Sequence, residues 1–154
     1  MKAFKIVLII LNLYVGGFLI YGSAGKFKET PKVTEIVDKV KSGEEVAPSE
    51  DILKIKNYIF GMKQTGYMWP FLGIMELLAG VLLISQVFSR IGAFIALPLT
   101  TNIFLFHLFL EGHEVGELIQ TLGLLVANIV LIAASYKLWK PLLVDRSAVK
   151  LSTN

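Results

Sequence analysis

Hydrophobic residues in this 154-residue chain gather in four long segments separated by polar ones. Each segment is close to the ~20 apolar residues that a helix needs to cross the hydrocarbon core of a bilayer. We therefore predict an all-α membrane protein, a bundle of four transmembrane helices in one domain. The predicted spans are residues 6–25, 66–87, 91–110 and 118–136, followed by a tail at 137–154.

The long polar segment at residues 28–63 contains two apolar stripes with helical spacing. One stripe follows Pro31, a favourable first residue of a helix, and ends at Gly43. The other follows Ser49, a favourable N-cap, and runs to Met62. Neither stripe is long enough to span, so we predict two short amphipathic helices at the membrane surface or over the mouth of the bundle. A solvated linker is the alternative.

The first apolar segment also has features of a signal peptide, because a basic start precedes it and small residues, Ser23 to Gly25, end it. It is longer than the roughly 7–15 apolar residues of a typical signal sequence, however. It also contains Asn12, Tyr14 and Tyr21. We therefore predict that it is a retained transmembrane helix.

Charged residues outside the spans predict the orientation. The N-terminal lysines, Arg90 and the basic tail at 137–154 fall on one side of the membrane, and the acidic loop at 111–117 falls on the other. The positive-inside rule then places both termini in the cytoplasm. The lysines of the segment at 28–63 oppose this assignment, but acidic residues in the same segment offset them.

Composition supports a membrane protein and excludes several classes of function. Hydrophobic residues make up 55% of the chain and charged residues 18%, which is more apolar surface than one soluble core absorbs. The net charge of +3 comes from basic residues at helix ends rather than from a basic stripe, so no nucleic acid is expected. The chain has no cysteine, which excludes a thiol–disulfide relay and an iron–sulfur cluster bound by this chain.

The most informative residue is Glu76, which lies midway along the span 66–87. A carboxylate at that depth costs on the order of 2.5 kcal/mol or more, so it should face protein or trapped water. The other spans each carry one amide at a similar depth: Asn12, Asn102 and Asn128. Since unpaired amides are costly in hydrocarbon, we expect these side chains to converge on the bundle axis.

Two interpretations of this polar layer stay open. The side chains either join the helices by hydrogen bonds or line a pocket that handles a ligand or protons. Lys26 lies near the outer boundary, and we expect it to be too far away to neutralise Glu76. Without a cation beside it, buried Glu76 is expected to be protonated much of the time. It could then donate to a carbonyl, such as a quinone oxygen, or pass on a proton.

A second polar cluster occupies the end of the third span and the loop that follows. His107 and Glu111 are four residues apart, and His113, Glu114 and Glu117 come next. By residue type, His107, His113 and Glu117 are candidate metal ligands, and two histidines could also bind haem. No HExxH motif is present, and a short acidic loop at a membrane surface requires no ligand. We therefore favour a His107 that is hydrogen-bonded within the bundle over a metal or haem site.

Three short sequences resemble the DoxX family of small four-helix membrane proteins. They are GSAGKF at 22–27, GIMELLAGVLLI at 73–84 and Ser-Arg at 89–90. The resemblance extends over all four spans. It is clearest at Glu76, where the family has a glutamate between glycines, and at Lys26, where it has a lysine after a glycine.

The resemblance implies a protein of the bacterial cytoplasmic (inner) membrane that works with redox systems. Some relatives are the small subunit of a thiosulfate:quinone oxidoreductase, and others accompany superoxide- and thiol-handling partners. Because this chain has no cysteine, a direct thiol role is disfavoured, and quinone binding or partner anchoring remain compatible. The segment at 28–63 is longer than in the simplest members, which leaves its role open.

Our leading hypothesis is an accessory or anchoring subunit of a quinone-linked membrane oxidoreductase, rather than an independent enzyme. No GxSxG, Walker or GxGxxG motif is present, so no catalytic residue is assigned. The alternatives are a small transporter or carrier of a lipophilic ligand, and a purely structural subunit. The expected partners are the lipid bilayer and other membrane or periplasmic subunits, with a homo-oligomer left open.

Overall fold

The computed structural model describes residues 2–27, 39, 41–43 and 50–143. Every regular element in these parts of the chain is helical. The elements are α1 (Lys2–Ala24), the short 3-10 helix η1 (Gly25–Phe27), α3 (Glu50–Gln64), α4 (Met68–Ile84), α5 (Ser89–Leu110), α6 (Val115–Ala134) and α7 (Tyr136–Leu143). The all-helical prediction is confirmed, and each predicted span corresponds to one helix.

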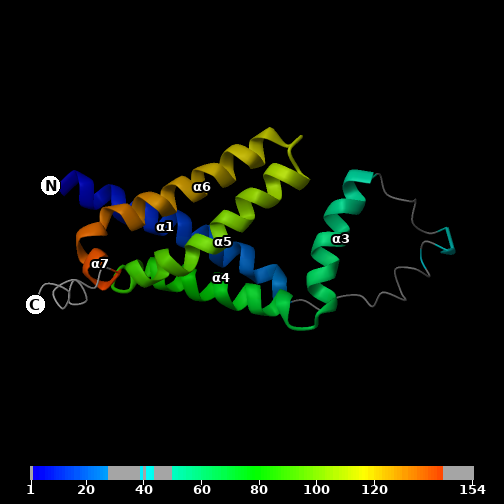
Figure 1. Cartoon of the computed structure of the whole chain (residues 1–154), viewed down its shortest axis with the longest axis horizontal. Coiled ribbons are helices and arrows are strands. Elements are labelled where there is room, and N and C mark those ends of the chain that lie inside the picture. Colours follow the sequence, from blue (N-terminus) through cyan, green and yellow to red (C-terminus); the bar gives the residue numbers. More distant parts are fainter. Residues whose placement is uncertain (1, 28–38, 40, 44–49, 144–154) are drawn as a thin grey trace, which may run out of the picture.

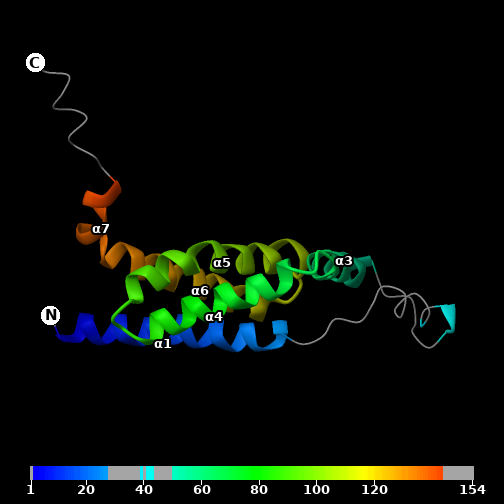
Figure 2. The same ribbon diagram turned by 90° about the horizontal axis from the view of Figure 1, so that it is seen from below.

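Four long helices lie side by side along the molecule (Figures 1 and 2). Helix α1 packs on α4 and α6, and α5 packs on α4 and α6. All four contribute to one buried apolar core. Its members are Val15, Leu19, Ala79, Leu83, Ala93, Ala96, Leu99, Leu124, Ala127 and Leu131. Many of the large apolar side chains on the outer faces are exposed, as expected for helices that face lipid.

Three helical segments are long and apolar enough to cross a membrane: residues 2–27, α5 and α6. Helix α4 has 17 residues and is too short to meet this criterion alone. Together with α3, from which it is bent by 91°, it is long and apolar enough. Several candidate membrane-spanning helices therefore indicate a membrane protein. Helix α4 is shorter than the predicted span 66–87 because the chain turns at Gly66, whose positive φ of 76° favours glycine.

Helix α3 lies across the end of the four packed helices (Figure 1) and contacts α4 and α5. This confirms the second amphipathic helix predicted for residues 28–63. Ile59 and Met62 are partly buried, while Ile52 and Leu53 are exposed. The first predicted helix, from Pro31 to Gly43, lies almost entirely outside the described residues.

The segment predicted as a tail, residues 137–154, begins within a short helix, α7. Helix α6 ends at Ala134, and α7 turns away from the packed helices (Figure 2). Trp139 on α7 donates a hydrogen bond from Nε1 to the carbonyl of Ile132 at 2.9 Å, and its ring packs edge-on against Phe94. An aromatic side chain that is half apolar and half polar suits this position at the end of a span.

Helices α1 and α4 approach closely at two glycines. A Cβ on Gly80 would lie 2.7 Å from the carbonyl oxygen of Gly16, and a Cβ on Gly16 would lie 2.9 Å from the carbonyl oxygen of Gly80. Small residues at such crossings let helix backbones pack directly against each other in a membrane. The glycines on this face of α4 therefore set the spacing of the α1–α4 pair.

We expect Gly80→Ala to destabilise the protein, because the added methyl group meets backbone that cannot move away cheaply. Overpacking of this kind costs about 1–3 kcal/mol. The matched control is Gly17→Ala on α1, where an added Cβ meets nothing within 4 Å. Thermal unfolding in detergent should show a lower midpoint for Gly80→Ala only, and equal midpoints for the two variants would contradict the close approach.

Candidate functional site

Glu76 forms an ion pair with Lys26. The Nζ of Lys26 lies 2.7 Å from Oε2 of Glu76 and also donates to the carbonyl of Gly22 at 2.9 Å. The side chain of Glu76 is 3% exposed and that of Lys26 is 13% exposed. The expectation that Lys26 lies too far from Glu76 to neutralise it is therefore wrong.

The local sequence explains why the two charges meet. Lys26 lies in η1, directly after α1, and its side chain reaches back over the last turn of that helix. Gly73 lies one turn before Glu76, and a Cβ there would come within 2.9 Å of Cβ of Lys26. The glycine thus makes room for η1 against α4. A buried carboxylate requires such a partner, because desolvation without one is strongly unfavourable.

The ion pair forms part of the wall of a cavity of about 130 Å³ between η1, α3, α4 and α5. Most of the lining is aromatic or aliphatic, with polar groups at a few points. The lining residues are Lys26, Tyr58, Ile59, Met62, Trp69, Leu72, Glu76, Asn102, Ile103, Phe106 and His107. An apolar cavity with a few convergent polar groups is the usual form of a small-molecule site.

Asn102 does face this cavity, but it is exposed on α5 rather than buried on the axis. The hydroxyl of Tyr58 on α3 donates to Oδ1 of Asn102 at 3.1 Å. Tyr58 also packs against Phe106, with ring centroids 5.4 Å apart. Asn102 therefore helps to hold α3 over the cavity, which is a role that the sequence did not predict.

The ring of Trp69, in the first turn of α4, contacts two ammonium groups. The Nζ of Lys26 is 5.3 Å from the centroid of its ring, and the Nζ of Lys63 is 5.1 Å from it. Such cation–π contacts stabilise an exposed site by about 0.5–1 kcal/mol each. Trp69 therefore couples the position of Lys26 to the last turn of α3.

Asn12 is buried as predicted, but it does not lie beside Glu76. Its Nδ2 donates to Oε1 of Gln86 at 3.1 Å, and Gln86 follows the C-terminal end of α4. Among the residues that the structure describes, none donates a hydrogen bond to Oδ1 of Asn12. Asn12 therefore meets the chain beyond the C-terminal end of α4, whereas Glu76 lies in the middle of α4 and pairs with Lys26 after the end of α1. The predicted single polar layer is wrong.

Asn128 is fully buried between α5 and α6, away from the cavity. Its amide contacts Oγ1 of Thr100 at 3.2 Å. When the amide is oriented to satisfy both of its ends, its nitrogen donates to the carbonyl of Ala93 at 3.1 Å and its oxygen accepts from the N–H of Leu97 at 3.0 Å. Asn128 thus joins α5 and α6 by hydrogen bonds and lines no part of the cavity at Glu76.

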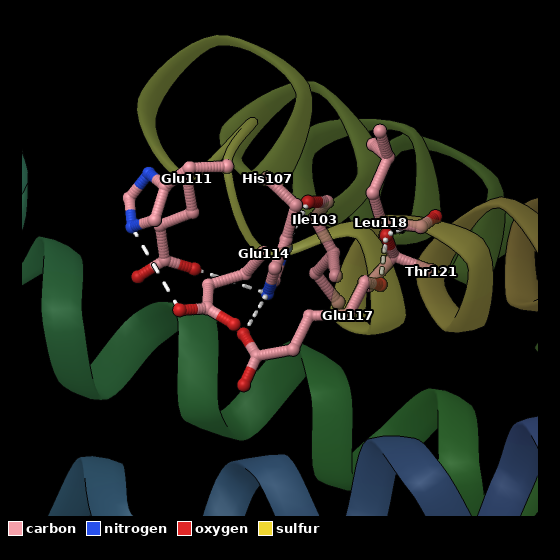
Figure 3. A network of polar contacts seen from close by, with 8 residues as sticks. Ile103, His107, Glu111, Glu114, Glu117, Leu118 and Thr121 are labelled. Atoms are coloured by element: carbon pink, nitrogen blue, oxygen red, sulfur yellow. Dashed lines mark hydrogen bonds and ion pairs between the residues drawn. The ribbon is translucent and has the colours of Figure 1, made fainter.

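The histidine cluster lies at the same end of the molecule as the cavity. His107 hydrogen-bonds through Nδ1 to the carbonyl of Ile103 at 2.8 Å, which confirms the predicted hydrogen bond. Its Nε2 lies 3.4 Å from a carboxylate oxygen of Glu111 and 3.4 Å from one of Glu117 (Figure 3). His113 does not join them, since it is exposed and pairs with Glu114 at 3.9 Å.

No protein-family model, curated relative or solved structure matches this chain. The functional interpretation therefore depends on the chemistry of the cavity. At its wall a buried ammonium group can donate to a carbonyl oxygen, and the adjacent carboxylate can exchange a proton. Sequence reasoning identified Glu76, Asn102 and His107 but did not identify Tyr58 or Trp69. The sequence signal for these two residues was that they are aromatic and lie near the end of a span. Aromatic residues are common at membrane–water interfaces, so this signal does not single out a site.

We expect Lys26→Met and Glu76→Gln each to destabilise the protein by about 3 kcal/mol, because each leaves a buried polar group without its partner. The double variant should recover much of this loss. A double-mutant cycle in detergent measures the coupling.

The control for this cycle is Lys63→Met, which removes a cation from the same Trp69 ring without touching the ion pair. Its effect should be below about 1 kcal/mol. Additive effects of the Lys26 and Glu76 substitutions would show that the ion pair is not formed.

Proposed function

We propose that the chain is an integral membrane protein in which α1, α4, α5 and α6 form a four-transmembrane-helix bundle. Three apolar segments of sufficient length and the bent pair α3–α4 support this. Helix α3 then lies along the membrane surface, at 91° to α4. The start of α1, the start of α5, which carries Arg90, and α7 lie at one end of the molecule (Figure 1). The positive-inside rule assigns that end to the cytoplasm of a bacterial inner membrane.

We further propose that the chain is an accessory or anchoring subunit of a quinone-linked membrane oxidoreductase, similar to the DoxX family. The observation that carries this proposal is the aromatic-lined cavity at the Lys26–Glu76 ion pair. An engineered apolar cavity of about 150 Å³ binds benzene. A cavity of about 130 Å³ is therefore on the scale of one six-membered ring.

The residues around this cavity suit the ring of a quinone. Trp69 and Phe106 offer aromatic contact, and the ammonium group of Lys26 is a charged donor for a carbonyl oxygen. Glu76 is the adjacent group that can exchange a proton with a bound quinol. In this proposal the chain binds and orients the ring, and a partner subunit supplies or removes the electrons.

The two tryptophans of the chain allow a direct test of ring binding. Trp69 lines the cavity, whereas Trp139 lies on α7 at the other end of the molecule. In Trp139→Phe, which keeps Trp69, duroquinone should quench the fluorescence to a saturating limit. In Trp69→Phe, which keeps Trp139, quenching should rise in proportion to concentration, because the quinone only collides with the protein.

Glu76→Gln in the Trp139→Phe background should weaken the saturable quenching at least tenfold. Equal, non-saturating quenching of both tryptophans would show partition into the detergent rather than binding. It would remove the quinone from the proposal and leave the partner-anchoring role.

The accessory role is tested by purification in mild detergent, followed by mass spectrometry of the co-purifying chains. We expect an oxidoreductase subunit, and Glu76→Gln should lower the quinone-linked activity of that complex without dissociating it. Full activity of the Glu76→Gln complex would exclude a role of the carboxylate in turnover. Ligand flux into liposomes by the isolated protein would instead favour a transporter or carrier.

A further inference from the structure

We propose that His107, Glu111 and Glu117 bind one divalent metal ion of the zinc class. The ligand atoms are Nε2 of His107 and one carboxylate oxygen from each glutamate, and all three lie within 4.8 Å of one another. This site is distinct from the proposed quinone site at Lys26 and Glu76, although the ring of His107 also borders that cavity.

Three consecutive pieces of the chain bring the ligands together. His107 lies in the last turn of α5, Glu111 directly follows that helix, and Glu117 lies in the first turn of α6. The turn between α5 and α6 thus folds the carboxylates onto both sides of the imidazole (Figure 3). The exposed fractions of the side chains are 18%, 22% and 57%, so the cluster can be reached from outside.

The hydrogen bond of the imidazole turns Nε2 toward the two carboxylates. Because Nδ1 lies 2.8 Å from the carbonyl oxygen of Ile103, Nδ1 carries a proton and donates it. Nε2 then faces two carboxylate oxygens, which are acceptors only. With Nδ1 occupied by the carbonyl of Ile103, Nε2 is the ring nitrogen that is free to coordinate a metal ion together with the two carboxylates.

The separations of the ligand atoms accommodate a metal ion. Nε2 is 3.4 Å from both carboxylate oxygens, which is longer than the usual 2.7–3.2 Å of an N–H···O hydrogen bond. Ligands about 2.0–2.1 Å from a tetrahedral zinc ion lie about 3.4 Å from one another. The three ligand atoms all lie within 4.8 Å of one another, so small side-chain rotations would place them around one ion.

The surroundings also match those of a metal-binding histidine. Such a histidine usually donates its other ring N–H to a carbonyl or carboxylate, which fixes its tautomer and orientation, and Ile103 supplies that carbonyl. Three protein ligands leave the fourth tetrahedral position open. A crevice of about 550 Å³ between α1 and α6, lined in part by His107, Glu117, Tyr14 and Tyr21, is the space from which a water or other oxygen ligand would reach that position.

The test uses the full chain in detergent, stripped of metal and then dialysed against zinc. We expect about one zinc ion per chain by mass spectrometry of the metal, and a zinc-dependent rise in the thermal midpoint. Cobalt in place of zinc should give the intense visible bands of a tetrahedral site. Loss of a group that hydrogen-bonds a metal ligand typically weakens metal binding 10–100-fold. Loss of one of the ligands should weaken zinc binding at least as much.

The key variants are Glu117→Gln and His107→Gln, with His113→Gln and Glu114→Gln as matched controls from the same turn. Glu117→Gln should lose zinc while keeping the midpoint that the metal-free protein has, because its side chain is 57% exposed. The control variants should bind zinc as the parent protein does. Failure of the parent to bind zinc, or equal binding by Glu117→Gln, would overturn the site and leave an imidazolium ion pair. Neither result bears on duroquinone binding at the Lys26–Glu76 cavity.

Discussion

The ion pair between Lys26 and Glu76 determines the arrangement of the α3 end of this molecule. A carboxylate that is 3% exposed requires a nearby cation, and the chain supplies one from the turn after α1. That requirement brings η1 against α4, where Gly73 leaves room for it. The ring of Trp69 then contacts the ammonium groups of Lys26 and of Lys63 in the last turn of α3, so the helix that covers the cavity is linked to the same pair of charges.

Much of the fold was predictable because the length of an apolar segment limits what it can form. Four segments of nearly bilayer length became four packed helices, and a stripe ending at Met62 became α3. The glycines that flank Glu76 were also informative, since an added Cβ would meet the side chain of Lys26 at Gly73 and the backbone of α1 at Gly80. Helix α7 was missed because its short apolar stripe is interrupted by charges and by Pro141.

The candidate site was only partly predictable, because its geometry depends on how the helices are staggered. Placing the polar residues by their distance from each helix middle put Asn12 level with Glu76. In the structure α4 begins at Met68, after the turn at Gly66, and Asn12 meets Gln86 beyond its far end. Helix α4 is thus displaced along α1 from the position in which their middles would coincide, and this displacement brings Glu76 to the level of Lys26. Hydrophobic periodicity carries no information about such a displacement.

The bend between α3 and α4 makes α3 a separate cooperative unit. Helix α3 contributes no described residue to the core, contacts α4 and α5, and is joined to α4 by a turn at Gly66, while the four long helices share one core. Its backbone amides should therefore exchange hydrogen through local opening, at a lower free energy than the global unfolding that exposes the amides around Leu83 and Leu124. The cavity under α3 can then be uncovered and closed again while the rest of the protein stays folded.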